Sequence, residues 1–139
     1  MKFILSYYNK KTGESTVKVR HLRKNFYGKA QLHPEDVPSE YFGCRIAEKR
    51  AMIQALKYER RIAKKEAEIC RKFCQSCIQY AKFNPEDASA KSMARQLSVK
   101  INRVNNITNE INILLMEIKT DILKRKKILN MTNKDKDTT

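Results

Sequence analysis

Tryptophan is missing from this sequence of 139 residues, and glycine (3), proline (3) and histidine (2) are scarce. So few glycines leave no Gly-rich loop that could cradle a phosphate, and two histidines offer little material for proton-transfer chemistry. Runs of about 18 apolar residues are also lacking, so no membrane-spanning helix is predicted. These scarcities argue against most classes of enzyme, and we predict a non-enzymatic protein that needs no cofactor.

The start of the chain, MKFILSYYNKK, has only a short apolar run and no small-residue cleavage site. It is therefore not expected to act as a secretory signal. Four cysteines without such a signal point to free thiols in a reducing compartment. We predict a cytoplasmic protein, in a bacterial or a host cytosol.

The first 33 residues are typical of a small sheet. Residues 2–8 (KFILSYY) are rich in aromatic and branched side chains, and residues 16–22 (TVKVRHL) alternate apolar and polar side chains with the period of a strand. Gly13 is expected to supply the turn between them, and Arg23, Lys24 and Asn25 a second turn before a strand at 26–32. The pattern predicts a three-stranded antiparallel meander, which needs a helix against its apolar face.

Two long helices are predicted to follow a Pro-containing segment at 33–39, where Asp36 or Ser39 can cap the first of them. Between Glu40 and Phe83 there is no proline, and small or apolar residues recur every seven positions, with Ala and Cys in the second half. A break at 83–87 precedes a second helix to about Asn130, and residues 131–139 are expected to be disordered. The fold class is therefore α+β, mostly α: residues 1–57 hold the sheet and the start of the first helix, and residues 40–130 form a coiled-coil-like antiparallel hairpin.

The apolar stripe of the second helix carries more bulk than the Ala/Cys half of the first helix can cover. Ile107, Leu114 and Leu115 are predicted to remain at the surface. This exposed stripe favours a homo-oligomer or docking on a larger protein complex.

Residues 26–57 contain a frame of small residues and turn formers, namely Gly28, Ala30, Pro34, Asp36, Gly43, Ile46, Ala47, Arg50 and Ala51. In this frame the chain resembles a small bacterial family of uncharacterised domains that has been likened to double-stranded-RNA-binding domains. The resemblance implies a small antiparallel sheet packed on a helix. It brings no catalytic or binding residues with it.

Three cysteines, Cys70, Cys74 and Cys77, have the C-x3-C-x2-C spacing of some iron–sulfur sites. Here they fall on one face of a continuous helical pattern, and a fourth ligand is distant, because Cys44 lies about 39 Å away along the helix. Packing of small apolar side chains explains them best. A structural metal, a redox role and a cluster enzyme stay open as alternatives.

His21 and His33 have no cysteine near them in the sequence, so a structural or solvent-exposed position is favoured for both. The acidic pairs Glu35–Asp36 and Glu86–Asp87 precede the two helices. Helix capping explains them without acid–base chemistry.

Positive charge is the feature that most exceeds what a solvated surface needs. Lys and Arg number 30 against 15 Asp and Glu, a formal net charge of +15, and the excess is spread along the chain. Basic proteins bind phosphate backbones through counterion release with little sequence selectivity. The predicted contact residues are Lys18, Arg20, Arg23 and Lys24 in the sheet and Lys57, Arg61, Lys64, Lys65 and Lys72 on one side of the first helix.

Two functions follow from these patterns. The first is a non-enzymatic protein that binds a nucleic-acid backbone, most readily a duplex of RNA or DNA, without strong sequence specificity. The alternative is a helical-hairpin interaction protein, such as a phage or mobile-element factor that docks on or inhibits a larger complex. A plain solvated basic face and an acidic protein partner remain further explanations of the charge.

Overall fold

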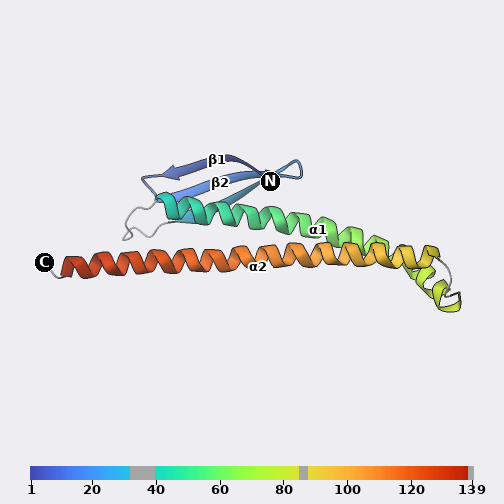
Figure 1. The fold of residues 1–139 in the computed structure, drawn as a ribbon. Helices are drawn as coiled ribbons and strands as arrows, with labels where there is room; N and C mark the ends of the chain where they lie inside the picture. Colours follow the sequence, from blue (N-terminus) through green and yellow to red (C-terminus); the bar gives the residue numbers. More distant parts are fainter. Residues whose placement is uncertain (32–39, 85–87, 138–139) are drawn as a thin grey trace. The chain divides into compact units, whose positions relative to one another are not determined.

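The computed structural model describes residues 1–31, 40–84 and 88–137 (Figure 1). Three strands, β1 (Lys2–Asn9), β2 (Glu14–His21) and β3 (Lys24–Gln31), precede two helices, α1 (Glu40–Phe83) and α2 (Ala88–Asp137). The strands form one antiparallel sheet in the order β1-β2-β3. The predicted fold class, an N-terminal meander followed by two long helices, is confirmed.

The chain divides into two compact units. The first unit combines Met1–Leu56 with Ile111–Thr139, and the second is Lys57–Glu110. Each unit therefore holds one segment of α1 and one segment of α2, and the sheet belongs to the first. Within the described residues, neither helix contains a stretch long and apolar enough to cross a membrane.

The sheet packs one face, its inner face, against the first part of α1 (Figure 1). Ser15, Val17 and Val19 alternate along β2 on this face, and all three are buried. Burial of each valine contributes roughly 1.5–3 kcal/mol to folding. Close contact requires small residues on the partner elements, which are Gly28 and Ala30 on β3 and Gly43, Ala47 and Ala51 on α1.

Hydrogen bonds fix both edges of the sheet to α1. Arg50 Nη1 donates to the Lys29 carbonyl oxygen on β3 at 2.8 Å. On β1, the Ser6 hydroxyl donates to Cys44 Sγ at 3.4 Å. The sheet is therefore held to the helix by polar contacts at its edges as well as by its apolar centre.

The β1–β2 connection follows the predicted turn. Gly13 has φ 71°, a conformation that suits glycine, and its N–H donates to the Asn9 carbonyl oxygen at 2.8 Å. The Asn9 side chain accepts a hydrogen bond from the Lys11 N–H, as in an Asx turn.

The β2–β3 turn lies earlier than predicted. His21 pairs with Lys24, so the loop consists of Leu22 and Arg23 alone, and β3 begins at Lys24 where a turn was expected. Both loop residues have positive φ, 50° and 65°. This is the geometry of a two-residue hairpin turn, which usually selects Asn or Gly. The sequence offers neither residue here, and for this reason the prediction placed the turn wrongly.

We expect Leu22→Asn to stabilise the protein by about 0.5–1 kcal/mol. Asparagine tolerates the left-handed conformation that a leucine adopts at a cost. Leu22 is also exposed, so its replacement removes little buried area. Urea unfolding followed by circular dichroism measures the change. A drop in stability would show that the contacts of the leucine side chain stabilise the protein by more than its positive φ angle costs.

Helix α1 ends as predicted at Phe83. The Asn84 N–H donates to the Tyr80 carbonyl oxygen at 2.9 Å, and the Asn84 side-chain amide reaches the same oxygen at 3.4 Å. The capping residues Asp36 and Ser39, together with His33, and the acidic pair Glu86–Asp87 lie outside the described residues.

Helix α2 differs from its prediction at its end and along its buried stripe. It continues past Asn130 to Asp137 in place of the expected disordered tail, because the tail contains no proline or glycine that would end it. Ile107 is buried, not exposed, whereas Leu115 is exposed as predicted. Between residues 91 and 127, the buried positions of α2 are Ile107, Ile111, Ile118 and Asp121.

Candidate nucleic-acid interface

The five predicted contact residues of α1 lie on one exposed face of the second unit. Lys57, Arg61, Lys64, Lys65 and Lys72 are all exposed, and their spacing places them within about 100° around the helix. They extend over about 22 Å of helix length. We call these five side chains the basic face of α1.

Two other acids of α1, Glu59 and Glu66, lie on the opposite side of the helix from the basic face and are engaged with α2. Glu59 and Glu66 form ion pairs with Arg103 on α2, at 3.5 and 3.1 Å, and Glu66 also pairs with Lys100. Two of the carboxylates of α1 are thereby directed toward α2 within this unit. The basic face is left with an excess of positive charge.

Glu68 is the one acid that lies among the five cations. Arg71 Nη2 donates to its carboxylate at 2.8 Å. This hydrogen bond, with the nearby charges of Arg71 and Lys72, lowers the pKa of Glu68, so the carboxylate is ionised at neutral pH. Arg71 neutralises it. Within the described residues, none of the five cations of the basic face forms an ion pair.

Comparison with family models, curated proteins and solved structures finds no match to this chain.

The sheet does not bring its four predicted contact residues onto one surface. Lys18 and Arg20 alternate with the buried valines of β2 and lie on the outer face of the sheet, away from α1. Arg23 lies in the exposed turn. Lys24 pairs with His21 and falls on the opposite side from Lys18 and Arg20. The sequence prediction placed Lys24 in a turn, so it did not show on which face of the sheet this residue lies.

Two tyrosines on the outer face escaped the sequence prediction. Tyr27 lies directly across from Lys18, with the Lys18 ammonium 5.8 Å from the centre of its ring. Tyr7 lies across from Thr16 on the neighbouring strand. Only a correct strand pairing shows that these side chains share a face with Lys18 and Arg20.

Among the four cysteines of α1, Cys74 is buried and the other three are half-buried. Cys74 is 1% exposed, its Sγ lies 3.6 Å from Cys70 Sγ and 3.9 Å from the Met93 carbonyl oxygen, and all four cysteines are free. Burial, reinforced by Cys70, raises the pKa of the Cys74 thiol. A protonated thiol is a poor nucleophile and a poor metal ligand. Among the described residues, no group of three or more His, Cys, Asp or Glu side chains is placed to hold a metal ion.

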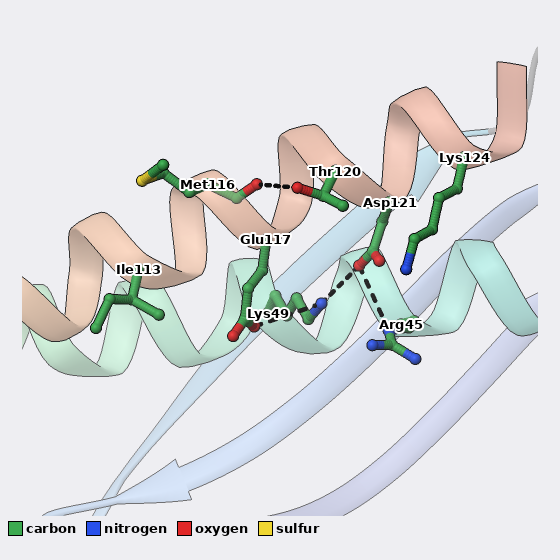
Figure 2. Close-up of a pocket in the computed structure, with 8 residues that line it drawn as sticks. All are labelled: Arg45, Lys49, Ile113, Met116, Glu117, Thr120, Asp121 and Lys124. Carbon is green, nitrogen blue, oxygen red and sulfur yellow. Dashed lines mark hydrogen bonds and ion pairs between the residues drawn. The ribbon is translucent and has the colours of Figure 1, made fainter. Parts of the chain in front are cut away.

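A hollow of about 350 Å³ in the first unit is lined by charged residues of α1 and α2 (Figure 2). Lys49 Nζ lies 2.6 Å from Asp121 Oδ2 and 3.5 Å from Glu117 Oε2, and Arg45 Nε lies 3.5 Å from the same Asp121 oxygen. Lys49 and Asp121 are 9% and 3% exposed. These two cations and two anions pair with one another and join the helices, and Lys124 also lines the hollow.

Proposed function

We propose that this protein is a non-enzymatic nucleic-acid-binding protein that contacts the phosphate backbone through the basic face of α1. The observation that carries the proposal is the charge arrangement on that helix. Five cations lie on one face of the helix, and Glu68, the acid among them, is paired with Arg71. The acids Glu59 and Glu66 lie on the other side of α1, where they pair with α2. An ordinary solvated helix face mixes its charges, with acids and bases in partnership along the surface.

Backbone contact fits this geometry better than base recognition does. Lysine ammonium groups are compact charges on flexible stems that approach phosphates without a fixed orientation. A duplex carries one negative charge per about 3.4 Å along each strand, so the basic face, about 22 Å long, can approach several phosphates at once. Such contacts position a protein on a duplex and carry no sequence information.

The test is a salt titration of duplex binding by the wild type and by the variant Arg61→Gln/Lys64→Gln/Lys65→Gln. Each neutralised phosphate contributes about 0.9 to the slope of log affinity against log salt concentration. We therefore expect the slope to fall by about two to three, equally for duplexes of different sequence. Helix content should persist, because glutamine is a good helix former.

A matched control removes the same amount of charge elsewhere. Lys119, Lys126 and Lys127 are exposed on the α2 segment of the first unit, and their triple change to glutamine should leave the slope almost unaltered. Equal losses in the two variants would mean that net charge alone, and not the basic face, attracts the duplex. Absence of salt-sensitive binding by the wild type at about 50 mM salt would overturn the proposal.

A second candidate function is docking on a larger protein complex. It is favoured by the exposed apolar side chains of Ile113, Met116 and Leu123 on the α2 segment of the first unit. Exposed apolar patches commonly mark protein interaction sites. If the titration shows no nucleic-acid binding, this surface becomes the leading account of the function.

A further inference from the structure

The outer face of the sheet carries aromatic and basic side chains in adjacent rows. Strand pairing aligns Leu5, Lys18 and Tyr27 in one row and Tyr7, Thr16 and Lys29 in the next. A third row holds Lys2, Arg20 and Asn25. These residues occupy the side opposite the buried residues Ser15, Val17 and Val19, and are called here the outer face.

The rings on this face contribute little to the core. Tyr7 is 57% exposed, Tyr27 is 53% exposed and Leu5 is 55% exposed. Standard strand spacing places Tyr7 and Tyr27 about 12 Å apart, one on each edge strand with β2 between them. Both are held on a scaffold that α1 fixes, since Arg50 holds β3 and Cys44 contacts β1. Their positions are therefore set by the fold, and more than half of each residue's surface remains exposed. The Lys18 ammonium lies over one face of the Tyr27 ring, which leaves the other face for a base.

The charges around the two rings complement a polyanion. Lys2, Lys18 and Arg20 lie on this face, and within the described sheet the acid on the same side is Glu14, whose carboxylate lies 3.7 Å from Lys29. Thr16 and Asn25 add side chains that can donate and accept hydrogen bonds between the rings and the cations. The face thus combines a net positive charge with stacking surfaces.

We infer that the outer face is a stacking platform for single-stranded nucleic acid, in which unpaired bases lie on Tyr7 and Tyr27 and phosphates lie near Lys18 and Arg20. The inference rests on the proposed function, nucleic-acid binding. It specifies that the ligand of the outer face is a nucleic acid with unpaired bases. A duplex buries the faces of its bases, so its phosphates alone could contact the cations. An aromatic side chain stacks with any base, because every base has a π face, and sequence selectivity would be weak.

The test measures binding of fluorescein-labelled U12, dT12 and a 12-base-pair duplex by anisotropy. The Tyr7→Leu/Tyr27→Leu variant removes both rings but retains apolar side chains and every charge. We expect its affinity for the single strands to fall by about 30-fold or more, as for the loss of two stacked bases. Its salt slope and its affinity for the duplex should remain unchanged. Comparison of U12 with dT12 tells whether the platform distinguishes RNA from DNA.

The matched control is Tyr7→Phe/Tyr27→Phe, which keeps both rings and removes only the hydroxyls. This variant should bind U12 and dT12 within about threefold of the wild type, because stacking uses the ring face. The thermal midpoint of the leucine variant should stay close to that of the wild type, since both tyrosines are exposed. A preserved midpoint separates lost stacking from lost folding.

Three results would contradict the inference. If salt-dependent duplex binding is present but the leucine variant binds single strands as well as the wild type does, the platform fails and the proposed function stands. If the wild type binds no nucleic acid, both fail together. If the leucine variant instead changes the mass in sedimentation equilibrium from dimer to monomer, the outer face is covered by a second copy of the chain.

Discussion

Asp121→Ala is expected to lower the free energy of unfolding by about 3–5 kcal/mol. The substitution removes the carboxylate that lies 2.6 Å from the buried Lys49 ammonium and leaves it only the more exposed Glu117, at 3.5 Å. Breaking a buried ion pair by removing one partner is strongly destabilising, because the remaining charge stays desolvated. Urea unfolding, with the thermal midpoint as a second readout, measures the loss.

Two further variants test whether desolvation is the cause. Glu117→Ala removes the more exposed partner of Lys49 and should cost about 1 kcal/mol or less. Lys49→Met/Asp121→Leu replaces the whole pair by apolar side chains and should recover most of the stability that Asp121→Ala loses. An Asp121→Ala protein as stable as the wild type would mean that Lys49 reaches solvent without its partner.

Gly28→Ala is expected to destabilise the protein by about 3 kcal/mol, through a clash that a side-chain rotation does not relieve. A Cβ atom at this position would overlap the Ala47 carbonyl oxygen and the Ala51 backbone nitrogen. Both are backbone atoms of α1, so β3 would have to move away from the helix. Overpacking of this kind costs about 1–3 kcal/mol, occasionally more, and the rigid neighbours place this site at the upper end.

Gly43→Ala is the matched control for this substitution. Its Cβ would meet the Ser15 Oγ, the end of a side chain that can change rotamer. Alanine also gains up to about 1 kcal/mol over glycine in a helix. The control should therefore cost much less than Gly28→Ala, and chemical denaturation of both variants compares them directly. Equal costs would contradict the close approach of β3 and α1.

The elements of this fold could be predicted because their signals are local. Alternation in TVKVRHL identified β2, and the absence of proline from Glu40 to Phe83 fixed the length of α1. The Leu22–Arg23 turn was missed because its residues do not favour the positive φ angles that they adopt. Because the turn was misplaced, β3 was predicted to start too late. The pairing of Tyr27 with Lys18 was therefore not predicted.

The basic face of α1 was predictable, but its significance depends on long-range pairing. Helical spacing alone groups Lys57, Arg61 and Lys64 on one side. Nothing local indicates that Glu59 and Glu66 pair with Arg103 on α2. The same limit applies to Asp121, which in sequence is an ordinary acid between Thr120 and Ile122 and becomes a buried partner only when Lys49 lies opposite.

The Lys49–Asp121 pair also bears on how the chain avoids misfolding. Helices that pair through a seven-residue repeat of small and apolar side chains can also associate after one helix shifts by seven residues along the other. Such a slide would bring Leu114 or Ile128 to the place of Asp121 opposite Lys49. Either residue would deprive the ammonium of its nearest carboxylate, which penalises the slipped arrangement. The carboxylate of Asp121 thus favours the observed alignment of these two segments over alignments that are shifted by seven residues.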